Sequence, residues 1–180
     1  IDDIAGRPVY LKAEVLQHTG SFKFRGGWSA LTALTVDQRD RGVIAFSSGN
    51  HAQGVARAAQ ILAVPATILM PADAPSLKIA NTRAMGADVV LYDRKGGEDR
   101  NALGASLSAE RGLTLVKPYD DVMVMSGQGT CGLEIAEQAL AAGVEKATVL
   151  TCCGGGGLTS GIATALEARA PGLRVRPVEP

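Results

Sequence analysis

Short apolar runs alternate with longer stretches of helical period along most of this chain. Six of these runs have the length and residue types of β-strands. They are GVIAFSS (42–48), ATILMP (66–71), DVVLYD (88–93), TLVKP (114–118), ATVLTC (147–152) and LRVRPV (173–178). The pattern therefore predicts six strands, each separated from the next by another element.

Longer segments between the strands place Ala, Leu, Ile and Val at helical spacings. They are HAQGVARAAQILA (51–63), PSLKIANTRAMG (75–86), EDRNALGASLSAERG (98–112), GTCGLEIAEQALAAG (129–143) and LTSGIATALEARAPG (158–172). The charged stretch RKGGEDR (94–100) is interpreted as a solvated loop. Strands that alternate with helices predict an α/β fold of parallel sheets joined by right-handed crossovers. In such folds ligands bind at the carboxyl ends of the strands.

Two glycine-containing turns follow predicted strands and open predicted helices. In SSGNHAQG (47–54), Ser47, Ser48 and Asn50 are candidate helix caps, and the free amides of the turn can hold a carboxylate. In CGGGGLTSG (153–161), four consecutive glycines exceed what a plain turn needs, and they let backbone amides approach a ligand closely. With a helix N-terminus behind it, this second turn suits a phosphate, the alternative being a flexible connection.

A third glycine motif, GQGTCG (127–132), matches the dinucleotide-binding pattern GxGxxG. That function needs an acidic residue about 20 positions later to hold the ribose hydroxyls. The chain has Cys152 and Cys153 there instead. We therefore interpret Gly127, Gly129 and Gly132 as residues of a tight turn and of close helix packing, and a dinucleotide-binding module stays only a remote alternative.

Lys23 lies in TGSFKFRGG (19–27), among small residues that leave room for a planar partner. A lysine becomes a nucleophile near neutral pH when desolvation or a neighbouring charge lowers its pKa, and its usual reaction is a Schiff base with a carbonyl. An isolated lysine is more often a surface residue. Together with a phosphate-binding turn and a carboxylate-binding turn, however, Lys23 indicates pyridoxal phosphate and an amino-acid substrate.

Composition excludes several other classes of function. Eighteen basic residues balance eighteen acidic ones, so no net charge attracts the chain to nucleic acid or to an anionic membrane. No apolar run approaches the roughly 20 residues of a membrane span, and no signal peptide is evident, so we expect a cytoplasmic protein. Cys131, Cys152 and Cys153 lack the spacing of a zinc site and are interpreted as buried small side chains.

Segments covering most of the chain resemble the β-family (fold type II) of pyridoxal-phosphate enzymes, in its threonine/serine dehydratase and serine racemase branch. The matching segments are LKAEVLQHTGSFKFRGG (11–27), SSGNHAQGVA (47–56), PADAPSLKIANTRAMGADVVLYDR (71–94), PYDDVMVMSGQGTCGLEIAEQ (118–138) and CGGGGLTSGIATAL (153–166). The resemblance implies a three-layer fold with helices on both sheet faces, like the tryptophan synthase β-subunit. It implies two lobes: a small domain of residues 42–119 inserted into a large domain of residues 1–41 and 120–180.

The same resemblance implies a role for each motif residue. Lys23 forms the Schiff base with the cofactor, Phe22 packs beside it, and Asn50 bonds the ring hydroxyl oxygen. The substrate carboxylate is bound by the turn that contains Ser47, Ser48 and His51. The phosphate is held by the backbone amides of Gly154, Gly155, Gly156, Gly157 and Leu158. Glu179 resembles the first ligand of a divalent-cation site, for Mg²⁺ or another cation, and an exposed loop carboxylate is the alternative.

The implied reaction is β-elimination from a hydroxy amino acid such as L-threonine or L-serine, which yields a 2-oxo acid and ammonia. Lys23 removes the Cα proton, and the small lobe closes over the substrate. Ser48 stands on the opposite face in racemase-like members and is a second catalytic candidate, although a capping role explains it equally well. The alternatives are a serine or aspartate racemase, a β-replacement enzyme, or a dehydratase of 3-hydroxyaspartate or of a hydroxyectoine-derived compound.

Both ends of the chain look cut, because it starts at Ile1 without an initiator methionine and stops at Pro180, directly after a predicted strand. The residue that meets the pyridine nitrogen in this family is expected downstream of Pro180. We therefore expect an incomplete large domain and poor or no activity of the 180-residue piece alone. The family resemblance implies a homodimer when the protein is complete.

Overall fold

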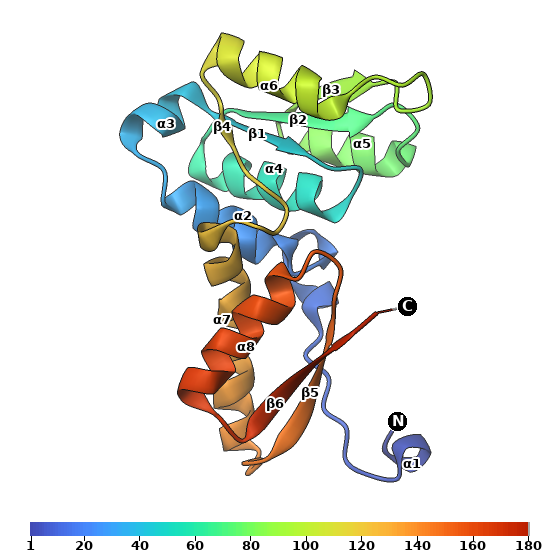
Figure 1. Ribbon diagram of the computed structural model, residues 1–180, viewed down its shortest axis with the longest axis vertical. Coiled ribbons are helices and arrows are strands. Elements are labelled where there is room, and N and C mark those ends of the chain that lie inside the picture. Colours follow the sequence, from blue (N-terminus) through green and yellow to red (C-terminus); the bar gives the residue numbers. More distant parts are fainter. Residues whose placement is uncertain (180) are drawn as a thin grey trace.

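The computed structural model describes residues 1–179 and shows two separate β-sheets in them (Figure 1). The first sheet has the strand order β3-β2-β1-β4 and the second pairs β5 with β6. The strands are β1 (Val43–Phe46), β2 (Ala66–Pro71), β3 (Asp88–Tyr92), β4 (Thr114–Leu115), β5 (Ala147–Cys152) and β6 (Leu173–Val178). All pairings between them are parallel, which confirms the predicted α/β class.

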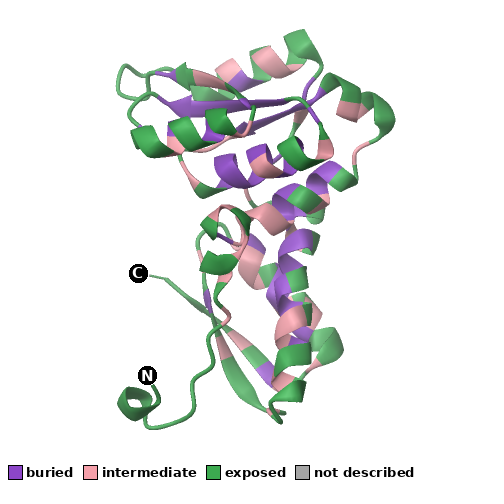
Figure 2. Ribbon diagram, turned by 180° about the vertical axis from the view of Figure 1, so that it is seen from behind, coloured by how far each residue is buried: buried purple, intermediate pink, exposed green. Residues whose placement is uncertain are grey.

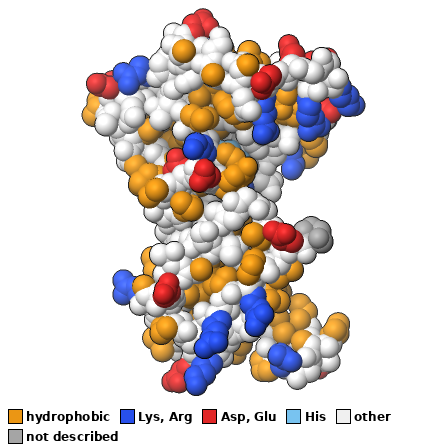
Figure 3. Space-filling model, in the orientation of Figure 1, with side chains coloured by type: hydrophobic (Ala, Val, Ile, Leu, Met, Phe, Trp, Pro, Cys, Tyr) orange, Lys and Arg blue, Asp and Glu red, His pale blue; other side chains and the backbone are white. Residues whose placement is uncertain are grey.

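Helices cover both faces of the first sheet, with α6 on one face and α4 and α5 on the other (Figure 1). On the second sheet α8 packs against the strands and α7 lies beside α8. The helices are α1 (Asp2–Ala5), α2 (Lys23–Thr32), α3 (Val36–Arg41), α4 (Asn50–Leu62), α5 (Ser76–Ala84), α6 (Arg100–Arg111), α7 (Val122–Ala141) and α8 (Gly157–Arg169), with short 3-10 helices at Glu14–Leu16 and His18–Gly20. The molecule narrows between its two halves, where α2 lies (Figure 3).

Most element boundaries agree with the sequence pattern, and the differences have local causes. Strand β4 ends at Leu115 rather than at residue 118, because Pro118 has no N–H to donate and the chain turns away from β1. Helix α7 begins at residue 122, seven residues early, because the Asp121 carboxylate caps the amides of Met123 and Val124. The pattern did not predict α2 or α3, although a capping box of Thr35 and Gln38 marks the start of α3.

Close helix packing explains the GQGTCG motif. All six residues lie inside α7, so the predicted tight turn is wrong, and the motif does not open a helix as a dinucleotide site requires. A Cβ added at Gly129 would lie 3.2 Å from the carbonyl oxygen of Gly161 in α8. A Cβ at Gly127 would lie 2.4 Å from the carbonyl oxygen of Arg25 in α2. The predicted packing role is therefore confirmed, with α7 in contact with two other helices.

Buried residues concentrate in the first sheet and in the helices beside it (Figure 2). Ile44, Ile68 and Met70 are completely buried there. A smaller cluster between α7, α8 and β6 includes Cys131, Ile162, Leu166 and Leu173. Of the three cysteines only Cys131 is buried, so the expectation is wrong for Cys152, which lies on the exposed face of β5, and for the half-buried Cys153. Within residues 1–179, none of the helices has both the length and the apolar character of a membrane span.

Replacing Gly161 by alanine tests the contact between α7 and α8. The new methyl group would lie 2.5 Å from the Met125 carbonyl oxygen and 2.6 Å from the Gly129 amide nitrogen. Alanine gains about 1 kcal/mol of helix propensity over glycine. Both contacts are with backbone atoms, which cannot move aside as a side chain can, so we expect a cost near the upper end of about 1–3 kcal/mol and a net destabilisation. We expect a lower melting temperature by circular dichroism, whereas Ser160→Ala, at the exposed neighbouring position, leaves it unchanged or slightly raised.

Candidate active site

Lys23 is the first residue of α2, and its amine is largely withdrawn from solvent. The Nζ atom donates a hydrogen bond to the carbonyl oxygen of Pro118 at 2.6 Å and lies 5.2 Å from the centroid of the Phe22 ring. None of the ion pairs found among residues 1–179 includes Lys23. Burial without a carboxylate partner therefore lowers the pKa of the Lys23 amine, which is the condition for a nucleophilic lysine.

The SSGN turn connects the carboxyl end of β1 to α4. The N-cap residue is Gly49, and no side chain caps α4, so the predicted capping roles of Ser47, Ser48 and Asn50 are wrong. The Ser47 hydroxyl accepts a hydrogen bond from the Gly49 amide at 3.1 Å, one residue before the helix. The first hydrogen bond of α4 runs from the Gln53 amide to the Gly49 carbonyl, so three preceding amides lack an acceptor within the helix and are free to bind an anion.

A second cation lies beside this turn. Lys78 projects from α5, and its Nζ atom is 3.5 Å from the Asn50 side-chain oxygen. A Cβ added at Gly49 would lie 3.0 Å from the same nitrogen atom. Lys78 is not identifiable from the sequence, since a lysine in an amphipathic helix gives no signal of which neighbouring turn it reaches.

The glycine loop connects the carboxyl end of β5 to α8 in the same manner. Gly156 is the N-cap residue, with a φ of +82° that favours glycine, and the first helical bond runs from the Ser160 amide to the Gly156 carbonyl. The amides of Gly157, Leu158 and Thr159 precede that bond. A Cβ added at Gly154 or Gly156 would meet nothing within 4 Å, so the space in front of these backbones is open. The loop therefore offers free amides, a helix N-terminus and room for a phosphate.

A short connection between β4 and α7 brings these parts together, and we call residues Val116–Tyr119 the crossover segment. The Val116 amide donates to the Ile44 carbonyl of β1 at 2.9 Å, and the Val116 carbonyl lies 3.0 Å from Nε2 of His51. Two residues later, the Pro118 carbonyl accepts the Lys23 hydrogen bond. Tyr119 then packs against the glycine loop, where a Cβ at Gly155 would meet its ring and a Cβ at Gly157 its backbone.

Helix α4 reaches the lysine helix through a glycine contact. A Cβ added at Gly54 would lie 2.8 Å from the carbonyl carbon of Lys23 and 2.9 Å from the amide nitrogen of Phe24. Gly27 of α2 faces the same residue, with a Cβ distance of 3.1 Å to the Gly54 carbonyl oxygen. The crossover segment thus contacts Lys23, His51, Gly155 and Gly157. The other predicted site residues are neighbours of these four along the chain, and their roles stay predictions: Phe22, Ser47, Ser48, Asn50, Gly154, Gly156 and Leu158.

An ion-pair network centred on Arg25 connects α2 to the N-terminal segment and to α7. The Arg25 guanidinium, whose side chain is only 8% exposed, donates to Glu14 and to Glu134 at 2.7–2.8 Å and to the Thr130 hydroxyl at 3.0 Å. Lys12 donates to Glu134 as well. These bonds raise the pKa of Arg25, and the Arg25 hydrogen bond lowers the pKa of Glu134 to about 2.

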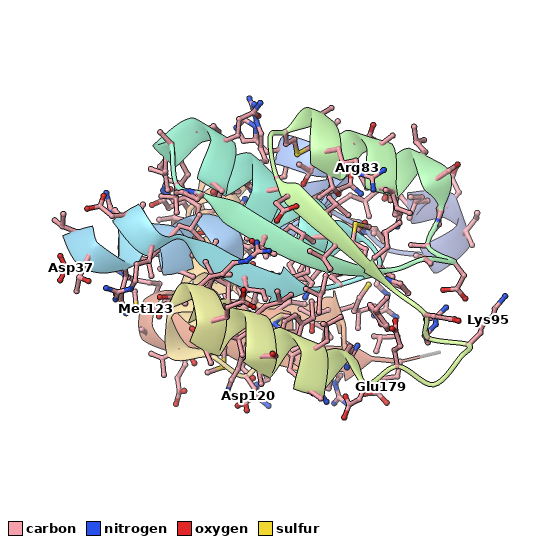
Figure 4. All side chains as sticks on the ribbon, turned by 90° about the horizontal axis from the view of Figure 1, so that it is seen from above. Asp37, Arg83, Lys95, Asp120, Met123 and Glu179 are labelled. Atoms are coloured by element: carbon pink, nitrogen blue, oxygen red, sulfur yellow. The ribbon has the colours of Figure 1, made fainter. Side chains whose placement is uncertain are left out.

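Glu179 is exposed and lies at the edge of the molecule when it is seen from above (Figure 4). Within residues 1–179, no three His, Cys, Asp or Glu side chains come close enough to hold a metal ion. The metal-binding role of Glu179 therefore stays a prediction.

The protein thus has a desolvated amine and two sets of free helical amides. A family model described as pyridoxal-phosphate dependent enzyme matches residues 1–180. The chain belongs to this family. The predicted resemblance is thereby confirmed, and with it the class of cofactor.

Individual relatives narrow the branch of the family. The chain is 45% identical to an L-threo-3-hydroxyaspartate ammonia-lyase of Saccharomyces cerevisiae, over the whole chain and 54% of the yeast protein. It is 47% identical to a catabolic L-threonine dehydratase of Staphylococcus aureus, over 93% of the chain and 47% of that protein. The structure of maize serine racemase superposes on 99% of the chain with a TM-score of 0.93 and 36% identity, covering 53% of the maize chain. The chain thus spans about half the length of the relatives that it matches.

Removing the Arg25 guanidinium tests the ion-pair network. In Arg25→Met, Glu14 and Glu134 lose their shared partner, and we expect a loss of stability on the order of 2 kcal/mol. Because the folded-state pKa of Glu134 is lowered from 4.5 to about 2, its contribution is present above pH 4.5 and is lost as the pH falls towards 2. Melting temperatures should therefore differ most between wild type and variant above pH 4.5, and the difference should shrink in acid.

Arg94→Met is the matched control. Arg94 pairs with Asp73 on the surface, where its side chain is 57% exposed, so its loss should leave the melting temperature unchanged. Equal effects of the two substitutions, or a difference that does not depend on pH, would contradict the role given to Arg25.

Proposed function

We propose that the protein catalyses pyridoxal-phosphate dependent β-elimination of a small hydroxy amino acid, such as L-threonine or L-serine, to a 2-oxo acid and ammonia. The observation that carries this proposal is the Lys23 amine, which is desolvated and forms no ion pair with a carboxylate of residues 1–179. The segment that accepts its hydrogen bond also contacts His51 of α4 and the glycine loop. The relatives named ammonia-lyase and threonine dehydratase support the same reaction class.

The residues present fit the cofactor. The open glycine loop and the first amides of α8 would bind its phosphate, through Gly154, Gly155, Gly156, Gly157 and Leu158. Phe22 would pack beside it, and Asn50 would hydrogen-bond its ring oxygen. The Lys23 amine would supply the covalent attachment. When bound, pyridoxal phosphate withdraws electrons from the Cα atom of an amino acid and so makes its proton acidic.

The substrate carboxylate binds to the turn of Ser47, Ser48 and His51 through the free amides at the start of α4. Once the substrate amine has taken its place, the free Lys23 amine, with its lowered pKa, would accept the Cα proton at Nζ. Lys23 would then return this proton to the departing β-hydroxyl, which leaves as water, and hydrolysis of the released enamine would give the 2-oxo acid and ammonia. Lys78 places a positive charge beside the turn, which favours an acidic side chain and supports 3-hydroxyaspartate as a variant substrate.

Residues 42–119 form the small domain in this proposal, and residues 1–41 and 120–180 belong to the large one. Two observations support the division: the four-stranded sheet lies wholly within the first range and the β5-β6 pair within the second. We further propose that the small domain closes over the substrate and excludes water. A homodimer, a cytoplasmic location and a divalent cation near Glu179 are the remaining parts of the proposal. The dimer and the cation rest on the family resemblance, and the location rests on the sequence pattern alone.

Amino-acid racemisation is the second candidate, and the exposed hydroxyl of Ser48 favours it. Its side chain is exposed and makes none of the hydrogen bonds found among residues 1–179, and α4 does not use it as a cap. A hydroxyl without a structural task is available to exchange a proton with Cα on the face opposite Lys23. The solved serine racemase that superposes on the chain supports this alternative.

Lys23→Ala tests the proposed function. In the full-length protein we expect loss of the visible absorption band of the bound cofactor and a fall in 2-oxo acid formation from L-threonine and L-serine by about 10³-fold or more. The matched control is Lys95→Ala, at an exposed position in the loop after β3, which should change neither (Figure 4). A band of normal intensity in Lys23→Ala would reject the assignment.

Ser48→Ala separates the two candidate reactions. If Ser48 exchanges the second proton, chiral chromatography of the amino acid should show racemisation reduced by about 10²-fold, while elimination falls less than about threefold. Equal losses of both reactions would mean that Ser48 only shapes the carboxylate turn. A wild-type protein that forms no D-amino acid would rule out the racemase candidate.

A further inference from the structure

His51 lies in the substrate-binding turn by sequence, yet its side chain points into the protein. The residue is 3% exposed, and Nε2 lies 3.0 Å from the Val116 carbonyl oxygen. Since a carbonyl oxygen only accepts, Nε2 must carry the proton. Nδ1 is then an acceptor, buried and without a partner among residues 1–179. Burial, opposed by the bond to Val116 and aided by the charge of Lys23, lowers the pKa of His51 to about 4.

A neutral, buried imidazole does not suit a ligand of the substrate carboxylate. Binding an anion through the side chain would require either a positive charge or a donor directed at the site, and the one donor of His51 is already used by Val116. The family resemblance implies that the turn containing His51 binds the substrate carboxylate. The His51 side chain must therefore have a different role from the backbone of the turn.

The bond to Val116 connects His51 with the reactive amine. Val116 is 2% exposed, and its amide donates to Ile44 of β1, so the His51 bond satisfies the second backbone polar group of this buried residue. The Pro118 carbonyl, which accepts from Lys23, is two residues further along the crossover segment. Removing the His51 donor would leave the Val116 carbonyl unsatisfied and release the segment that holds the Lys23 acceptor.

We propose that His51 is a positioning residue for Lys23: its Nε2–H holds the crossover segment so that the Pro118 carbonyl receives the amine and water stays out. This inference rests on the proposed function only in taking Lys23 as the reacting amine. Within residues 1–179, His51 makes no hydrogen bond to Lys23 itself. It acts through two backbone carbonyls of one short segment.

Two substitutions in the full-length protein test the hydrogen-bond donor of His51 separately from the volume of its ring. His51→Gln can place an N–H donor close to the position of Nε2, whereas His51→Leu keeps a similar volume and has no donor. His18→Gln is the matched control, because His18 is the other of the two histidines in the chain and lies on a different element. Circular dichroism shows whether each variant folds.

The first readout is the titration of the Lys23 amine in cofactor-free protein, which does not depend on turnover. Trace acetylation with acetic anhydride between about pH 6 and pH 11, followed by mass spectrometry, gives the midpoint for each lysine peptide. The internal reference is Lys95, whose side chain is 80% exposed. We expect His51→Leu to raise the Lys23 midpoint by about one pH unit as water reaches the amine, and His51→Gln and His18→Gln to leave it near the wild-type value.

The second readout is the protonation of His51 in wild-type protein, from long-range ¹H–¹⁵N NMR spectra. The proposal requires the neutral Nε2–H form at pH 7, and it is overturned by an Nδ1–H tautomer or a charged ring, even if His51→Leu does not fold. An unchanged Lys23 midpoint in folded His51→Leu, or equal shifts in the Leu and Gln variants, would also overturn it. A protein that shows these shifts but no elimination activity would reject the proposed function and keep the positioning role.

Discussion

The structure around the site depends on one constraint, which is that the Lys23 amine is buried without a carboxylate partner. Burying a charged ammonium costs free energy, so the amine needs a hydrogen-bond acceptor that does not favour the charged form as a carboxylate would. The Pro118 carbonyl is such an acceptor. A carbonyl can do this only if its own segment is held in place. Ile44 and His51 hold Val116 on one side, and the contact of Tyr119 with the glycine loop holds the segment on the other.

Glycines contribute to this arrangement in two ways, by allowing close contacts between helices and by leaving space for a ligand. Gly54 lets α4 lie against the backbone of Lys23, and Gly129 and Gly161 let α7 contact α8, so these residues shorten distances between helices. Gly154 and Gly156 instead face open space, where the absence of a side chain leaves room for a ligand. Sequence spacing alone does not distinguish the two uses, because the motif-like segments 47–54 and 153–161 contain packing glycines or ligand-facing glycines without any difference in residue type.

Much of the fold was predictable from the sequence, since Val43–Phe46 and Ala66–Pro71 are apolar runs of strand length between helical patterns. Helix α2 was not, because two glycines inside KFRGGWSALT obscure its period and tertiary contacts with α4 and α7 stabilise it instead. The motif residues of the site were also identifiable. Their supports were not: backbone carbonyls such as those of Val116 and Pro118 carry no residue-type signal, and the partner of Lys78 depends on how α5 packs.

Two cations, Lys23 and Arg25, lie two positions apart on α2 in opposite environments. Lys23 is the proposed reactive residue, and Arg25 anchors the helix to its neighbours. Residues two apart do not share a face of a helix, so α2 itself lies between them. Arg25 meets two carboxylates, which raise its pKa and fix the N-terminal segment and α7 to the helix. Those same carboxylates near Lys23 would stabilise its charge and make the amine unreactive. The helix therefore confines the negative charge to one side and keeps the reacting nitrogen on the other.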